Sequence, residues 1–101
     1  MENEVKMMRY QIKNEKLKVE IRDVGAELCS IQNGSGKEYL WQGDEATWPD
    51  QAPTLFPYVG RMWDKKYKYQ GQEYSMNIHG FAMEHAFVCQ KVREDYLLCS
   101  L

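Results

Sequence analysis

A strict two-residue alternation in residues 16–24 constrains the fold of this chain more than any other feature. Leu17, Val19 and Ile21 are separated by charged residues, so apolar side chains share one face and charged side chains share the other. Successive side chains of a strand point to opposite faces of a sheet, and this period therefore predicts a half-buried β-strand. No segment carries a convincing helical period, so we expect the core to be built from strands.

Turn signals separate several further short segments with the composition of strands. They are residues 26–32, 38–41, 66–69, 73–76, 86–92 and 96–101. The cluster at 33–36, Asn-Gly-Ser-Gly, predicts a reversal, and Gln-Gly-Gln at 70–72 predicts a short hairpin. Residues 42–51 and the proline-bracketed segment 53–60 are expected to be loops, because proline cannot donate to a sheet. Short strands at regular intervals predict an all-β, antiparallel sandwich.

The composition excludes several classes of partner. The net charge is -2 and charges of both signs are interspersed, so we expect no nucleic-acid partner and no membrane partner. The N-terminus lacks the apolar core of a signal peptide. Cys29, Cys89 and Cys99 are widely and irregularly spaced, which favours reduced thiols over a disulfide framework. Together these features predict a cytoplasmic location.

The ends of the chain suggest its domain organisation. Residues 1–8 are polar and are expected to form a loose leader, with the domain occupying residues 9–101. Residues 96–101 form an apolar strand with no closing turn, and such a strand leaves an exposed, adhesive edge. We interpret the chain as a fragment, a truncated product, or a protein that completes itself as a homo-oligomer through this unpaired edge.

Two loops carry the candidate binding residues. Arg61 ends one loop and His79 lies in the other, and both are surrounded by aromatic residues and glycines. Flat apolar faces beside a few convergent donors are typical of a sugar pocket. Trp63 follows Arg61 closely and is the candidate to stack on a pyranose face.

Several short motifs in a fixed order extend this interpretation. They are Gly25-Ala26-Glu27-Leu28, Trp41-Gln42-Gly43-Asp44, Trp48, Leu55-Phe56-Pro57-Tyr58-Val59-Gly60-Arg61, Tyr67-Lys68-Tyr69-Gln70-Gly71-Gln72-Glu73-Tyr74 and His79-Gly80-Phe81-Ala82. Through them, residues 10–101 resemble the amino-terminal part of the aldose 1-epimerase (galactose mutarotase-like) family. The resemblance implies an incomplete portion of a twisted antiparallel β-sandwich of the supersandwich type.

The same resemblance implies an activity without metal or cofactor, namely interconversion of the α and β anomers of a hexose. A base removes the proton of the C1 hydroxyl while an acid protonates the ring oxygen, and the opened ring recloses on its other face. Arg61 and His79 match the family positions that bind sugar hydroxyls and the ring oxygen. The catalytic histidine and glutamate are expected beyond Leu101, so the resemblance assigns no catalytic residue to this chain.

One position departs from the family pattern. Related sequences continue His-Gly-Phe-Ala with arginine, whereas this chain has Met83. A thioether carries no charge, so we expect no phosphate binding at this position.

Other readings of the residues remain open. Glu84 and His85 are adjacent and would face opposite ways on a strand, which disfavours a local acid–base dyad. The histidines and cysteines lack metal-ligand spacing, so no metal site is predicted. Alternative functions are a non-catalytic carbohydrate-binding remnant, or a module whose open β-edge pairs with a protein partner.

Overall fold

The computed structural model describes residues 7–101. Residues 1–6 of the expected leader lie outside the described residues, and Met7 and Met8 are exposed. The strands are β1 (Arg9–Lys13), β2 (Leu17–Arg22), β3 (Glu27–Asn33), β4 (Lys66–Tyr69), β5 (Gln72–Ser75), β6 (Val88–Arg93) and β7 (Tyr96–Ser100). Two 3-10 turns, η1 (Trp63–Lys65) and η2 (Ala82–Glu84), complete the described elements. None of the helical turns within residues 7–101 is long and apolar enough to cross a membrane.

The largest sheet has the antiparallel order β1-β2-β3. The alternating segment forms its central strand, with Val19 opposite both Ile12 and Ile31. This register confirms the strand predicted in residues 16–24. The first strand, β1, was not predicted, although Tyr10 and Ile12 repeat the same two-residue period.

The strand expected at residues 38–41 is wrong. Glu38 makes only an isolated bridge with Gln32. Its carboxylate accepts hydrogen bonds from Ser30 Oγ at 2.6 Å and from the Ile31 N–H at 2.7 Å. It also accepts from the Leu40 N–H at 3.1 Å. The Glu38 carboxylate therefore binds the N–H groups of Ile31 and Leu40. In a regular sheet, backbone N–H groups would instead donate to the carbonyl groups of a neighbouring strand.

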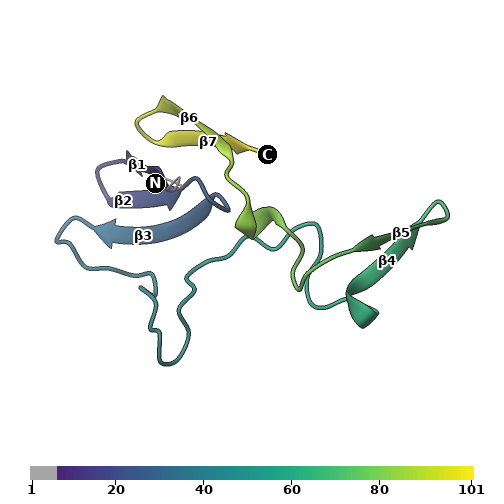
Figure 1. Cartoon of the computed structure of the whole chain (residues 1–101). Helices are drawn as coiled ribbons and strands as arrows, with labels where there is room; N and C mark the ends of the chain where they lie inside the picture. Colours follow the sequence, from purple (N-terminus) through teal and green to yellow (C-terminus); the bar gives the residue numbers. More distant parts are fainter. Residues whose placement is uncertain (1–6) are drawn as a thin grey trace, which may run out of the picture.

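Two antiparallel hairpins follow the central loops, as predicted. In β4–β5, Tyr67 lies opposite Tyr74, and their rings stack with centroids 5.2 Å apart. The β6–β7 hairpin lies beside the sheet and is joined to it through the Lys13 N–H, which donates to the Glu94 carbonyl at 2.8 Å. Figure 1 shows β6–β7 next to β1 and β2, whereas β4–β5 extends away from this body as an arm.

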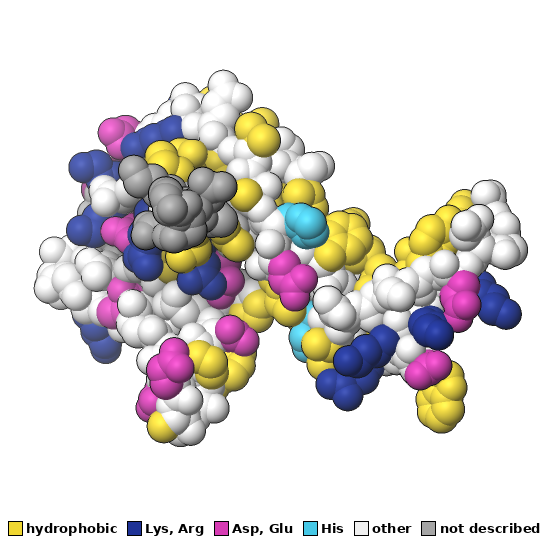
Figure 2. All heavy atoms as spheres, viewed as in Figure 1, with side chains coloured by type: hydrophobic (Ala, Val, Ile, Leu, Met, Phe, Trp, Pro, Cys, Tyr) yellow, Lys and Arg dark blue, Asp and Glu magenta, His cyan; other side chains and the backbone are white. Residues whose placement is uncertain are grey.

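The described residues bury little apolar surface. Ile21, Cys29 and Ala82 are the hydrophobic side chains buried within residues 7–101. The radius of gyration is 16.5 Å, compared with about 13 Å for a compact domain of 100 residues. Hydrophobic side chains are visible on the arm and where the arm meets the body (Figure 2). The fold is thus all-β, but many apolar side chains of its strands and loops are not covered.

Candidate functional site

The sheet fixes the start of the first candidate loop. The buried Glu27 carboxylate, on β3, accepts a hydrogen bond from Arg22 Nη2 at 2.6 Å and one from the Ala52 N–H at 2.9 Å. Two residues later, Thr54 Oγ1 donates to the Gly25 carbonyl at 2.5 Å. Residues 52–54 are therefore attached to one end of the sheet before the loop leaves it.

A close backbone contact joins the two candidate loops. The Phe56 carbonyl accepts hydrogen bonds from the N–H groups of Phe81 at 3.0 Å and Ala82 at 3.1 Å. Phe56 also forms an isolated parallel bridge with Gly80, whose φ is +81°. A glycine tolerates both this conformation and the approach of a carbonyl group. The contact explains why a glycine stands between His79 and the aromatic residue that follows.

Gly60 and His79 hold one another by two hydrogen bonds. The His79 N–H donates to the Gly60 carbonyl at 2.7 Å, and the Gly60 N–H donates to His79 Nδ1 at 2.9 Å. Because Nδ1 accepts a hydrogen bond, a neutral imidazole carries its proton on Nε2. His79 also has a φ of 64°, a left-handed conformation that histidine adopts more readily than most residues. The backbone thus fixes the position and the tautomer of this side chain together.

Arg61 follows Gly60 directly and is exposed. Its carbonyl accepts a hydrogen bond from the Tyr58 hydroxyl at 3.1 Å, which stabilises the turn from which the side chain projects. Within residues 7–101 its guanidinium has no ion-pair partner. The structure therefore places the positive charge and free donors of Arg61 directly after Gly60, the residue that is hydrogen-bonded to His79. Figure 2 shows histidine side chains where the body meets the arm.

Trp63 is placed apart from this pair. It begins η1 at the base of the arm, its side chain is 92% exposed, and it lines a shallow hollow with Tyr67 and Lys68. Neither Arg61 nor His79 lines that hollow. Sequence proximity to Arg61 is therefore the remaining argument for its part in sugar binding.

An apolar hollow of about 510 Å³ adjoins the contact between the two loops. Its lining consists of Thr54, Phe56, Phe81, Ala82, Phe87 and Leu101. Phe56 and Phe81 meet edge to face with centroids 6.5 Å apart. No charged side chain lines this hollow, whereas a hexose needs several donors and acceptors. The lining of this hollow therefore lacks the polar groups that a hexose site requires.

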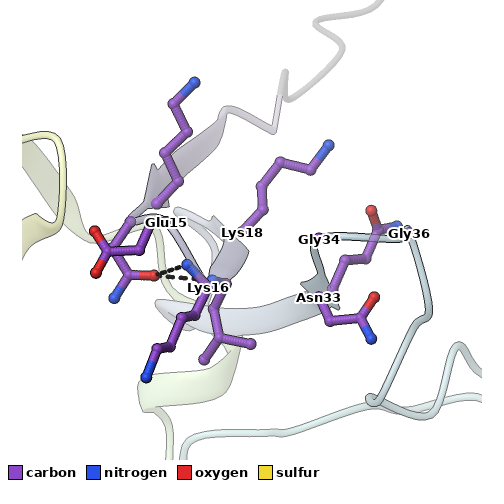
Figure 3. A pocket seen from close by; sticks show the side chains of 10 residues that line it. Glu15, Lys16, Lys18, Asn33, Gly34 and Gly36 are labelled. Carbon is purple, nitrogen blue, oxygen red and sulfur yellow. Dashed lines mark hydrogen bonds between the residues drawn. The ribbon is translucent and has the colours of Figure 1, made fainter.

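A second hollow, of about 220 Å³, lies between the turns that precede β2 and follow β3 (Figure 3). It is rich in lysines, but Lys16 and Lys18 extend in different directions. The Asn14 side chain is engaged by its own turn, since its Oδ1 accepts from the N–H groups of Lys16 and Leu17 at 2.8 Å each. The lysine side chains of this hollow therefore do not converge on one ligand position.

Glu84 and His85 do not lie on a strand. Glu84 ends η2, and the His85 and Phe81 rings meet in a T-shaped arrangement with centroids 5.7 Å apart. The backbone of the neighbouring Met83 lies against Gly25. Among the described residues, no group of three or more His, Cys, Asp or Glu side chains is placed to hold a metal ion.

Sequence reasoning missed the partners that position the site. Gly60 and Phe56 act through their backbone groups, so their own side-chain chemistry gave no indication of these contacts. The available signal was the glycine in each loop, because Gly60 and Gly80 both adopt positive φ values.

Comparison with known proteins agrees with this architecture. Over 99 residues the chain is 35% identical to protein LacX, plasmid, and 34% identical to protein LacX, chromosomal, both of Lactococcus lactis subsp. lactis. Each match covers 93% of this chain and 33% of the relative. The chain therefore spans about a third of the length of these relatives.

Two solved structures share the fold. A galactose mutarotase related enzyme from Lactobacillus acidophilus superposes with a TM-score of 0.81 at 38% identity, covering 86% of this chain and 29% of that one. A galactose mutarotase-like protein from Lactobacillus casei ATCC 334 gives 0.81 at 34% identity, covering 91% and 31%. These matches confirm the all-β, galactose mutarotase-like fold, present here in part. Because residues 8–101 match the aldose 1-epimerase family model, the chain belongs to the aldose 1-epimerase family.

Proposed function

We propose that this chain supplies the sugar-orienting side of an aldose 1-epimerase pocket. In this proposal Arg61 and His79 bind the hydroxyls and ring oxygen of a hexose. The observation that carries it is the pair of hydrogen bonds between Gly60 and His79, which holds the imidazole against the residue that directly precedes Arg61. Trp63 is a further candidate contact, through stacking on a pyranose face.

The tautomer of His79 assigns it a chemical role. With Nδ1 engaged by the Gly60 N–H, the side chain offers a single donor, Nε2–H, and no free nitrogen to accept a proton. His79 is therefore a hydrogen-bond donor and not the general base. A donor aimed at the ring oxygen stabilises the negative charge that develops there as the bond to C1 breaks. The Arg61 guanidinium can bind two sugar oxygens at once, which fixes the ring relative to that donor.

The proton transfers themselves are assigned elsewhere. Removal of the C1 hydroxyl proton and protonation of the ring oxygen require an acid and a base in contact with substrate. In the family these are a histidine and a glutamate that we place outside this chain. We therefore propose that these 101 residues bind a hexose but do not accelerate its mutarotation.

The test is an amide-resolved NMR titration of the chain with glucose and galactose. We expect saturable shifts at Gly60, Arg61 and His79, and imidazole ¹⁵N shifts typical of the Nε2–H tautomer. Arg61→Ala should abolish the response, whereas Arg93→Ala, which removes an exposed arginine at the end of β6, should leave it intact. His79→Asn should also abolish it, because asparagine tolerates the left-handed backbone but cannot supply the imidazole donor.

Other outcomes would contradict the proposal. Well-dispersed spectra that do not change when either sugar is added would support a remnant without carbohydrate binding. Indifference to sugar combined with concentration-dependent association would support the β-edge module. Polarimetry supplies a separate check, since a faster approach to anomeric equilibrium with this chain alone would place an acid and a base among its own residues.

A further inference from the structure

The β6–β7 hairpin brings two cysteines together. Cys89 on β6 lies directly opposite Cys99 on β7, and both are free thiols that are half-buried. Directly opposed residues of antiparallel strands have Cα atoms about 4.5–5.5 Å apart, and disulfides span Cα separations of about 4.4–6.8 Å. The backbone therefore already holds these residues at disulfide distance. Their separation in sequence did not reveal this, because it depends on the hairpin register.

The two thiols also interact with one another. Burial, together with a hydrogen bond to Cys99, raises the pKa of the Cys89 thiol to about 12. The Cys89 S–H also lies 3.9 Å from the Phe87 carbonyl, to which it donates. Because the thiolate is the form that attacks a disulfide, the raised pKa of Cys89 disfavours it as the thiol that starts an exchange reaction.

The third cysteine is an internal control. Cys29 is 2% exposed on β3, and its S–H donates to the Glu20 carbonyl at 3.5 Å. Burial raises the pKa of its thiol as well. It belongs to another sheet and has no opposing cysteine in the strand register. Reagents that need an accessible thiolate should not modify Cys29.

We propose that Cys89 and Cys99 form a reversible cross-strand disulfide site that reacts by exchange with a low-molecular-weight disulfide. The Cys99 thiolate attacks one sulfur of the small disulfide, forms a mixed disulfide and releases one small thiolate. Loss of the charge on Cys99 favours ionisation of Cys89. The Cys89 thiolate then attacks Cys99 Sγ, closes the protein disulfide and releases the second small thiolate. The protein loses two electrons and two protons, and the small disulfide gains both to become two thiols.

The bond would change the hairpin that carries it. An isolated pair of strands is marginally stable in water, and the β6–β7 register is interrupted between Lys91 and Arg93. A covalent link near the open end would hold both strands in register. Oxidation should therefore slow amide exchange throughout β6 and β7 while leaving β4–β5 unchanged.

Glutathione disulfide is the probe, added to the whole reduced chain, with intact mass and peptide mapping as readouts. We expect wild type and Cys29→Ser to lose two hydrogens and to link residues 89 and 99. Cys89→Ser should stop at a glutathione adduct on Cys99, because the resolving thiol is missing. Cys99→Ser should acquire its adduct on Cys89 more slowly, by about tenfold or more, because burial raises the pKa of the Cys89 thiol.

Three results would overturn the site. One is a stable glutathione adduct on wild-type Cys99 without closure. Another is a disulfide that includes Cys29. The third is the same mixture of pairings in urea as in buffer, which would show that the fold does not direct the reaction. Amide exchange of the oxidised and reduced wild type gives a readout that needs no variant, and equal protection of β6–β7 in both forms would remove the proposed effect on the hairpin.

Discussion

The Phe56 carbonyl group occupies the space into which a side chain on Gly80 would point. A Cβ atom there would lie 2.6 Å from the Phe56 carbonyl carbon and 2.8 Å from Pro57 Cδ, in addition to overlapping the carbonyl oxygen. Phe56 belongs to the loop that ends in Arg61, and Gly80 follows His79. This contact therefore determines how closely the two candidate binding residues can approach.

The first prediction is that Gly80→Ala separates the two loops. The added methyl group must overlap backbone atoms and adopt a φ of +81°, which together should destabilise the chain by about 2–4 kcal/mol. Urea unfolding measures the change, and the amide signals of Phe56, of residues 58–61 and of residues 79–82 should move. Gly34→Ala is the matched control, because nothing lies within 4 Å of its Cβ position. Equal effects of the two substitutions would contradict a special requirement at Gly80.

The second prediction concerns Glu27, which is buried beneath the loop start. Glu27→Ala leaves Arg22 without its 2.6 Å partner and the Ala52 N–H without its acceptor. Breaking such a pair should lower the free energy of unfolding by about 3 kcal/mol. Glu73→Ala is the control, because its 3.8 Å pair with Lys66 is half exposed and should contribute less than about 1 kcal/mol. Faster amide exchange at Ala52 and Thr54 is expected in the Glu27 variant alone.

Local patterns predicted most of the strands, and their failures have local causes. The alternation around Val19 identified β2, in which Ile21 is buried and Val19 is half-buried on the apolar face, although Leu17 on the same face is exposed. The Gln-Gly step at residues 70–71 located the β4–β5 turn. Residues 38–41 were assigned wrongly because the Glu38 carboxylate binds backbone N–H groups, an interaction that strand propensity does not include.

The arrangement of the site was less accessible to sequence reasoning. Arg61 and His79 were selected by residue type, but the contact between Gly60 and His79 Nδ1 joins positions far apart in the chain. The same is true of Cys89 and Cys99, whose pairing depends on hairpin register. Such contacts depend on how loops and strands are aligned in space, and a one-residue change of register would remove them without altering the composition.

The third prediction is a pH dependence that originates at Glu38. Hydrogen bonds from Ser30 and from backbone N–H groups lower the pKa of this carboxyl from 4.5 to about 2. A carboxyl with a lowered pKa in the folded state stabilises the fold above its unfolded pKa, and this contribution is lost as pH falls through the folded value. The loss should therefore occur between about pH 4.5 and pH 2.

Glu38→Gln should make the free energy of unfolding less dependent on pH over this interval, because the amide does not titrate. Urea unfolding at a series of pH values measures the effect. Glu45→Gln, a change of the same kind in an exposed loop, should preserve the wild-type pH profile. An unaltered profile in the Glu38 variant would assign the acid sensitivity to other carboxyl groups.

The fourth prediction separates binding from stability at Trp63. Its indole is 92% exposed at the base of the arm, so Trp63→Ala should change the free energy of unfolding by less than about 0.5 kcal/mol. If the indole stacks on a pyranose, the same substitution should weaken hexose binding roughly threefold to tenfold, the equivalent of about 0.5–1.5 kcal/mol. Tyr69→Ala is the control, because this aromatic residue is also exposed on the arm, at 61%. Titration of both variants with galactose compares them directly, and unchanged affinity in the Trp63 variant would leave Arg61 and His79 as the sugar contacts of this chain.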